Sequence, residues 1–185
     1  MSKQLKILAI PGSLRARSLN RAALLTAQAL APAKVSIELA SLADIPLYNG
    51  DLDVDGGPAP VRAFKRAIVE ADGLLIATPE YNYGVPGVLK NAIDWASRPA
   101  YPSPLAGKPV AMIGVAAGGV GGARALAHLK LVMLGVLSEV FPYPETLIGA
   151  AHKKFDDELR LTDEPTRAHL ERLVAAYGDW LARRV

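Results

Sequence analysis

Apolar and polar positions along the chain follow two different periods, and the shorter period predicts strands. Mostly apolar runs, which are typical of buried strands, occupy Leu5 to Ile10, Leu74 to Thr78 and Pro109 to Ala116. Val35 to Leu42 alternates apolar with polar residues, so we predict a less buried strand there, at an edge of the sheet. A fifth strand is predicted over Val136 to Phe141.

Segments in which apolar residues recur at helical spacing separate these strands. The predicted helices cover Arg21 to Leu30, Val61 to Ala71, Leu89 to Ala96, Ala123 to Leu134 and a C-terminal segment that includes Leu170 to Leu181. Gly135 is expected to close the fourth helix, because glycine readily adopts the left-handed conformation at helix ends. The last helix should begin at Thr162 or Asp163, with Pro165 in its first turn.

Strands that alternate with helices predict an α/β fold, in which a parallel sheet is covered by helices on both faces. With 185 residues, the chain is expected to form a single domain over residues 1–185. The Pro-, Gly- and Asp-rich stretch from Asp44 to Pro60 is interpreted as a long surface connection. Ligands of such sheets bind beyond the carboxyl ends of the strands, which here means the loops after Ile10, Thr78 and Ala116.

The first of these loops, Gly12 to Asn20, has the composition of a phosphate site. It lies between a buried strand and a helix, where free backbone N–H groups and the helix dipole favour an anion. Ser13 and Ser18 add hydroxyl donors, Arg15 adds a charged fork and Asn20 adds an amide. A single phosphate fits best, because the loop has neither a GxGxxG motif nor a Gly-Lys-Ser ending. The alternative is that Ser18 or Asn20 only caps the helix while the loop arginines point to solvent.

The second loop, Pro79 to Gly87, is bounded by prolines and rich in aromatic residues. A rigid turn of this kind can hydrogen-bond the edge of a planar heterocycle, with ring faces from Tyr81 and Tyr83 and a close backbone approach at Gly84. The alternative is a structural turn whose tyrosines cover the core. The third loop, Gly118 to Gly122, can lie against a ring, or it can simply reverse the chain.

Composition excludes several kinds of chemistry. The chain has no cysteine, so disulfides, thiolate nucleophiles and cysteine-ligated metals are ruled out. Its formal net charge of +3 is spread along the chain without interleaved aromatic residues, so no nucleic-acid partner is expected. The apolar run near the N-terminus is too short for a signal sequence or membrane span, which favours a cytoplasmic protein without a membrane partner. His128, His152 and His169 lie outside the three loops and no GxSxG motif occurs, so neither a hydrolase triad nor a metal site is expected.

The first two loops together resemble a known family. GSLRARSLN after the first strand and PEYNYGVPGVLKNAIDW after the third are similar to motifs of the NADPH-dependent FMN reductases, including their bacterial quinone and chromate reductase branch. The resemblance covers most of the chain and implies a flavodoxin-like three-layer fold, with five parallel strands in the order 2-1-3-4-5 and noncovalent FMN. By position, the residues that bind FMN would be Ser13, Arg15, Ser18, Leu19, Asn20, Pro79, Glu80, Tyr81, Asn82, Tyr83, Gly118 and Gly119.

The resemblance also implies an enzyme. Hydride would pass from NADPH or NADH through FMN to a small acceptor, such as a quinone, a free flavin, an azo compound or chromate. Because the flavin carries the chemistry, no catalytic acid–base residue is expected, and Glu80 is assigned to positioning the ring or substrate. This sequence differs from many relatives at Ala116, Ala117 and Gly84, where hydroxyl-bearing residues are common.

Two alternative functions belong to other classes. A flavodoxin-type electron carrier would bind FMN without turning over a small molecule, but such carriers tend to be acidic, and the net charge here is +3. A phosphate-binding module without flavin is the second alternative.

Family members are commonly homodimers or homotetramers, and the apolar segment Leu126 to Leu134 together with Glu145 is the candidate association surface.

Overall fold

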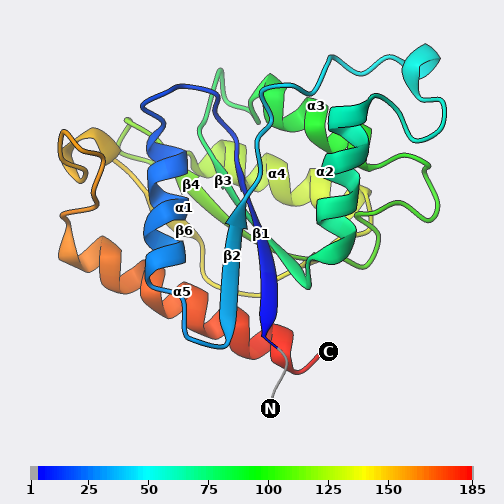
Figure 1. Ribbon diagram of the computed structural model, residues 1–185. Coiled ribbons are helices and arrows are strands. Elements are labelled where there is room, and N and C mark those ends of the chain that lie inside the picture. Colours follow the sequence, from blue (N-terminus) through cyan, green and yellow to red (C-terminus); the bar gives the residue numbers. More distant parts are fainter. Residues whose placement is uncertain (1–3, 185) are drawn as a thin grey trace.

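A computed structural model describes residues 4–184 and has a parallel sheet at its centre (Figure 1). The three long strands are β1 (Leu5–Pro11), β3 (Gly73–Thr78) and β4 (Pro109–Val115). The strand order is β2-β1-β3-β4-β5, with β2 (Val35–Leu39) at one edge. This order confirms the predicted flavodoxin-like fold, including the edge position of the second strand.

Helices cover both faces of the sheet, as the alternation of elements predicts (Figure 1). Five α-helices occur in the described residues: α1 (Leu19–Ala29), α2 (Ala59–Glu70), α3 (Gly87–Ala96), α4 (Ala123–Gly135) and α5 (Glu164–Ala182). Two short 3₁₀ turns, Gly50–Leu52 and Ala151–Lys153, lie in connections. Asp163 begins α5 by accepting a hydrogen bond from the Thr166 N–H at 3.0 Å, which decides between the two predicted start residues.

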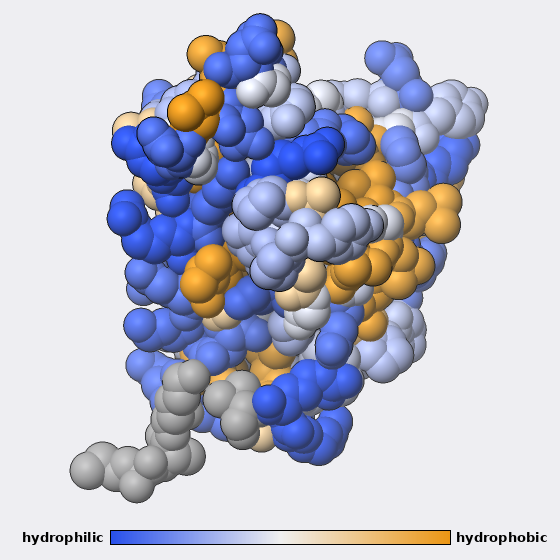
Figure 2. Space-filling model, turned by 90° about the vertical axis from the view of Figure 1, so that its right-hand side faces the viewer, coloured by the Kyte–Doolittle hydropathy of each residue, from blue (hydrophilic) through white to orange (hydrophobic). Residues whose placement is uncertain are grey.

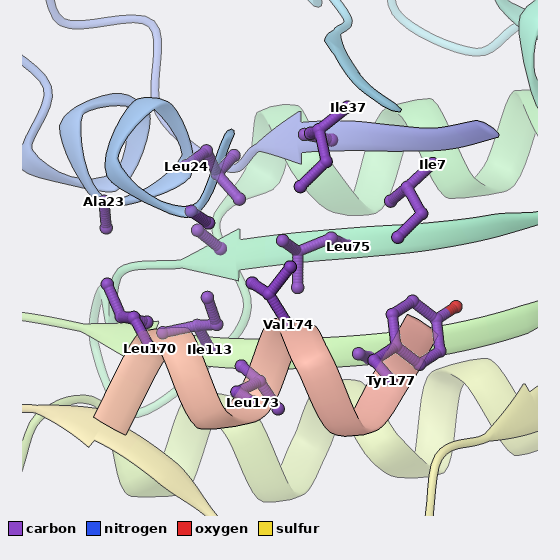
Figure 3. Packing of buried hydrophobic residues seen from close by; sticks show 14 of the residues in the cluster. Ile7, Ala23, Leu24, Ile37, Leu75, Ile113, Leu170, Leu173, Val174 and Tyr177 are labelled. Atoms are coloured by element: carbon purple, nitrogen blue, oxygen red, sulfur yellow. The ribbon is translucent and has the colours of Figure 1, made fainter. Parts of the chain in front are cut away.

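The alternating side chains of the strands divide the core into two halves. On β1, Ile7 faces α1 and α5, whereas Leu8 faces the side of α2, α3 and α4. Figure 3 shows the first half, where Leu24 of α1 and Val174 of α5 meet the sheet around Leu75. Because β1, β3 and β4 are buried on both faces, their carboxyl ends are held in a fixed arrangement.

The predicted fifth strand over Val136 to Phe141 is wrong in its bounds. Two short segments pair with β4 instead: β5 (Glu139–Val140) with its beginning and β6 (Thr146–Ile148) with its end. Pro142 and Pro144 lie between them, and proline has no N–H to donate to a ladder. The break therefore falls where the sequence cannot continue the pairing.

Other boundaries also differ from the prediction, by one to three residues. The second strand ends at Leu39 rather than Leu42, because its last partner on β1 is Ala9, close to Pro11, which has no N–H. The first helix begins at Leu19 rather than at the predicted Arg21, because Ser18 is its N-cap and accepts the Arg21 N–H. Gly135 is the last helical residue of α4 rather than a left-handed closure, and the positive φ of 62° falls at Leu137.

The long connection before α2 is fastened to α3. The Pro46 carbonyl accepts hydrogen bonds from Asn91 Nδ2 at 2.9 Å and from Trp95 Nε1 at 2.8 Å. Asn91 Oδ1 in turn accepts the Tyr48 N–H at 2.8 Å. Both ends of the Asn91 amide are thus satisfied, and the connection is an ordered surface segment.

Candidate functional site

The loops after β1, β3 and β4 meet at the carboxyl edge of the sheet (Figure 1). The Gly12 N–H, directly after β1, donates to the Ala77 carbonyl of β3 at 2.8 Å. A Cβ atom added to Gly12 would lie 3.2 Å from the ring of Pro79, which opens the second loop. On the other side, one added to Gly122 would lie 3.7 Å from Glu80, so the third loop borders the second. The three segments predicted from the sequence therefore adjoin one another and form one candidate site.

In the first loop, buried hydroxyls surround the beginning of α1. Ser13 and Ser18 are 9% and 3% exposed. Ser18 Oγ accepts the Arg21 N–H at 3.2 Å and thereby caps α1, while Ser13 Oγ accepts the Arg15 N–H at 3.4 Å. Each hydroxyl hydrogen remains available to donate to an anion. Capping, the alternative role predicted for Ser18, thus leaves the Ser18 hydroxyl hydrogen free to donate to a ligand.

Asn20 carries an unsatisfied polar atom inside this loop. The residue is 5% exposed, and its Nδ2 donates to the Val115 carbonyl at the end of β4 over 3.4 Å. Its Oδ1 is buried and has no hydrogen-bond partner. A buried acceptor without a partner costs about 1 to 3 kcal/mol, so it is expected where a ligand supplies the missing donor. A hydroxyl group of the ligand suits this acceptor, whereas a phosphate oxygen does not.

The two arginines of the first loop lie in different environments. Arg15 is exposed at the loop surface. Within residues 4–184 its guanidinium has no hydrogen-bond or ion-pair partner, so it is free to bind an anion. Arg17 is also exposed, but its Nη2 donates to the Asp157 carbonyl at 2.7 Å. Arg17 therefore fastens the loop to the segment before α5, and Arg15 is the better candidate for a phosphate contact.

The second loop contains a tight hairpin turn. Tyr81 and Gly84 exchange two backbone hydrogen bonds of 3.2 and 3.0 Å around Asn82 and Tyr83. Both central residues are left-handed, with φ of 49° and 67°, as a two-residue hairpin turn of type I′ requires. Tyr81 is 48% and Tyr83 71% exposed, so neither tyrosine covers the core. This excludes the structural alternative for the tyrosines and leaves both rings at the rim of the site.

Glu80 connects the second loop to α4. Its Oε2 accepts the N–H groups of Arg124 and Ala125 at 3.1 and 3.3 Å, and its Oε1 lies 2.8 Å from Arg124 Nη2. Partial desolvation raises the pKa of the Glu80 carboxyl, but the hydrogen bonds from Arg124 and Ala125 outweigh it and hold that pKa below its ordinary value. The carboxylate thus caps α4, whose own N-cap, Gly122, has no side chain. Both carboxylate oxygens are engaged, so only the backbone of Glu80 is available to a ligand.

The glycine loop after β4 is supported by the turn that follows β6. The Gly118 carbonyl accepts the N–H groups of Gly121 and Ala150 at 3.3 and 3.0 Å. Gly118 and Gly119 are exposed, and an added Cβ atom would meet nothing within 4 Å at either position. The loop therefore has open space on its outer side, where a planar ring can approach.

Sequence reasoning did not assign two residues that shape this site. Arg124 anchors the Glu80 carboxylate, and its guanidinium carbon lies 4.0 Å from the centroid of the Tyr83 ring. His128, one turn later on α4, lies beside Gly84. A Cβ atom added to Gly84 would lie 3.5 Å from His128 Nδ1. Neither contact has a local sequence signal, because each joins residues about 40 positions apart.

Within residues 4–184, no group of three His, Cys, Asp or Glu side chains is placed to hold a metal ion. None of the helices in the same range is both long and apolar enough to cross a bilayer. His169 contacts Thr146 Oγ1 at 3.1 Å, away from the three loops.

These features define the class of the protein. An open parallel sheet whose order reverses between β1 and β3, with a loop of buried hydroxyls and a helix N-terminus at that switch point, has the architecture of a flavodoxin-like mononucleotide-binding fold. The sequence profile of the NADPH-dependent FMN reductases matches residues 5–153. The chain belongs to this family.

Individual relatives agree with this assignment. The chain is 47% identical to an NAD(P)H-dependent FMN reductase of Pseudomonas aeruginosa, over 99% of this chain and 98% of the relative. It is 41% identical to a quinone reductase of Escherichia coli K12, with the same two coverages. Among solved structures, the flavoenzyme NAD(P)H:(acceptor) oxidoreductase FerB of Paracoccus denitrificans superposes with a TM-score of 0.88 at 37% identity, over 97% of this chain and 98% of FerB.

Proposed function

We propose that this protein is an FMN-dependent oxidoreductase that transfers reducing equivalents from NAD(P)H to a small organic acceptor. The observation that carries the proposal is the buried, unpartnered Oδ1 of Asn20, in the segment between β1 and the first turn of α1 that also contains the buried hydroxyls of Ser13 and Ser18. Donors for a phosphate and an acceptor for a hydroxyl lie together there, which is the combination that a ribityl phosphate requires. The family assignment agrees with this chemistry.

The binding roles follow the three loops. Ser13, Ser18, the Arg15 guanidinium and the N–H groups at Leu19 and the start of α1 would hold the FMN phosphate, and Asn20 Oδ1 would accept from the adjoining ribityl chain. The backbone of Pro79, Glu80, Tyr81, Asn82 and Tyr83 would line the edge of the isoalloxazine ring. Gly118 and Gly119 would close its other side.

The side chains of this site bind and orient, and they carry out no proton transfer. FMN, when bound, supplies the chemistry, by accepting hydride from NAD(P)H and passing two electrons to the acceptor. Glu80, the carboxylate of the second loop, is engaged with Arg124 and α4, so it is not free to act as an acid or base. The exposed rings of Tyr81 and Tyr83 leave one side of the site open, where donor and acceptor can enter in turn.

Steady-state kinetics test this proposal. The FMN-loaded protein is mixed with NADPH or NADH and varied concentrations of 1,4-benzoquinone, and nucleotide oxidation is followed at 340 nm. A shared binding place for donor and acceptor predicts parallel lines in double-reciprocal plots, the pattern of a ping-pong reaction. Binding of FMN without quinone-dependent turnover would instead assign the protein to electron carriage.

Quinones are the proposed acceptors, because the Escherichia coli relative at 41% identity is a quinone reductase and a Burkholderia relative, also at 41% identity, is a 2-hydroxy-1,4-benzoquinone reductase. Free flavins, azo compounds and chromate are further candidates to compare in the same assay. The choice between NADPH and NADH is read from the ratio of their kcat/KM values.

Association into a homodimer or homotetramer is proposed through the outer face of α4. Leu131 and Leu134 on α4 are 69% and 56% exposed, and the adjoining Leu137 is 52% exposed. α4 lies at the back in Figure 1, which is the right-hand part of Figure 2, where a broad hydrophobic area is visible. Such an area usually marks an interface. In light scattering, Leu131→Lys should shift the protein toward a monomer, whereas Leu47→Lys, at an 83% exposed loop position, should not.

A cytoplasmic location is proposed because the donor, NAD(P)H, is found there. Fractionation of the source cells tests it: the protein should appear with cytoplasmic enzymes, and recovery in the membrane fraction would contradict the proposal.

A further inference from the structure

We infer that Arg17 is a positioning residue for the flavin phosphate. It ties the phosphate loop to residues 149–157, which we call the support segment, and the same segment holds the glycine loop Gly118 to Gly122. The inference rests on the proposed function and adds to it an element that selects FMN over riboflavin. In Figure 1 the support segment is the yellow-to-orange stretch beside the start of α1.

Arg17 connects the phosphate loop to the support segment. Its Nη2 donates to the Asp157 carbonyl at 2.7 Å, across 140 positions of the sequence. The other hydrogen bond of the loop, from the Arg15 N–H to Ser13 Oγ at 3.4 Å, is internal. Within residues 4–184, the Arg17 bond is thus the only hydrogen bond that joins residues 13–17 to a distant part of the chain. Without it, the loop is held only where it leaves β1 and where it enters α1.

The Asp157 carbonyl belongs to a rigid turn. Phe155 and Leu161 pair at the base of this turn and are each 8% exposed. At its tip, Asp156 Oδ1 accepts the Arg160 N–H at 2.8 Å, and the Asp156 N–H donates to the Arg160 carbonyl at 3.0 Å. Arg17 therefore contacts an acceptor whose place is fixed by the core and by local hydrogen bonds.

The support segment also holds the glycine loop. The Ala150 N–H donates to the Gly118 carbonyl at 3.0 Å. A Cβ atom added to Gly149 would overlap the Gly119 carbonyl oxygen, so the two backbones are in close contact there. The segment thus contacts the loop proposed for the flavin phosphate at one end and a loop proposed for the flavin ring at the other.

A rigid segment that contacts both loops fixes the spacing between the phosphate donors and the ring edge before a ligand binds. Donors that are already in place bind more tightly, because less conformational entropy is lost on binding. Riboflavin has the ring and the ribityl chain of FMN but no phosphate, so it gains nothing from an ordered phosphate loop. The two ends of the support segment should therefore affect the two flavins differently.

Arg17→Met tests the phosphate end, because it keeps an unbranched side chain and removes the donor. The dissociation constant for FMN should rise about 3- to 10-fold, the range that the loss of one hydrogen bond gives. The constant for riboflavin should change less than about 2-fold. Quenching of flavin fluorescence gives both constants. In the flavin-free protein, amide hydrogen exchange over residues 13–18 should become faster, because the loop has lost its tie.

Gly149→Ala tests the ring end. The added Cβ displaces the glycine loop, so the dissociation constants for FMN and riboflavin should rise by the same factor, at least about 5-fold. The ratio of the two constants should then stay that of the parent. The melting temperature shows whether this variant folds, and if it does not, the Arg17→Met measurements decide the inference alone.

Arg62→Met is the matched control. Arg62 Nη1 also donates to a loop carbonyl, that of Gly57, at 2.5 Å. This bond lies in the connection before α2, outside the three loops and the support segment. The control variant should keep the parent affinities for both flavins and the parent exchange rates over residues 13–18.

The outcomes separate this inference from the proposed function. Equal changes in the two affinities of Arg17→Met, or no change in either, would overturn the positioning role. Weaker FMN binding with unchanged hydrogen exchange would show that Arg17 contacts the phosphate directly. A folded Gly149→Ala protein that loses affinity for FMN alone would show that the support segment does not serve the ring. If the parent binds neither flavin, the proposed function itself fails, while hydrogen exchange still shows whether Arg17 orders the loop.

Discussion

Replacing Asn20 by leucine should have opposite effects on the free protein and on its complex with FMN. In the free protein, the Asn20 side chain is 5% exposed, with an unpartnered Oδ1 and one long hydrogen bond of 3.4 Å from its Nδ2 to the Val115 carbonyl. Leucine has a similar shape and needs no partner. The unfavourable burial of Oδ1, about 1 to 3 kcal/mol, is removed, against the loss of a bond that contributes about 0.5 to 1.5 kcal/mol. The free energy of unfolding of the free variant should therefore stay within about 1 kcal/mol of the parent or rise.

In the complex the sign reverses. A ligand hydroxyl that loses its acceptor in a buried place costs about 1 to 3 kcal/mol, which weakens FMN binding roughly 5- to 150-fold. At a fixed excess of FMN, each tenfold loss of affinity removes about 1.4 kcal/mol of ligand-derived stability. Opposite effects on the free protein and on the complex are expected where a ligand-binding group destabilises the free protein, because that group has no hydrogen-bond partner until the ligand binds.

Two measurements on the same variant suffice. Denaturant unfolding with and without FMN gives both stabilities, and quenching of flavin fluorescence on titration gives the dissociation constant. Asn91→Leu is the matched control, since both ends of the Asn91 amide are bonded within the protein. That variant should lose stability and keep its FMN affinity. A free Asn20→Leu protein that is destabilised by more than about 2 kcal/mol, with unchanged FMN affinity, would show that Asn20 Oδ1 serves the fold and not the ligand.

The remaining predictions concern other parts of the site. Arg15→Ala should weaken FMN binding by about 1.5 to 3 kcal/mol in the same titration, and unchanged affinity would reject the phosphate contact. Gly114→Ala should lower the melting temperature, because the added Cβ would overlap the Gly121 carbonyl oxygen, whereas Gly118→Ala, in open space, should not. The bonds to Arg124 and Ala125 lower the pKa of Glu80 in the folded protein, so the parent should be more stable than Glu80→Gln at pH 7. This difference should shrink as the pH falls below the ordinary value of 4.5, and a constant difference would contradict the role of the charge.

Sequence was a good guide wherever a local pattern decided the structure. β1, β3 and β4 lie where long apolar runs predicted them, because strands buried on both faces need such runs. It was wrong in the bounds of the fifth strand, since only Glu139–Val140 of the predicted Val136 to Phe141 pairs with β4. The segment Thr146–Ile148 is only three residues long and gains its stability from β4, so no periodicity announces it.

The site shows the same division. Glycines, prolines and hydroxyl residues predicted the three loops, because these residues are neighbours in the sequence. Glu80 was assigned to the ring or substrate, but its carboxylate contacts Arg124, 44 positions away in the sequence. That distribution of contacts follows from the way α4 returns to the sheet edge, which residue types alone do not specify.

Anaerobic reduction of the FMN-loaded protein by NADPH or NADH is a direct test of FMN-dependent NAD(P)H oxidation. The protein is reconstituted with FMN, freed of excess flavin, and titrated with NADPH or NADH while its absorption near 450 nm is recorded. The flavin band should bleach with one equivalent of donor and return when 1,4-benzoquinone is added. A protein that retains no flavin, or a bound flavin that neither nucleotide reduces, would contradict it.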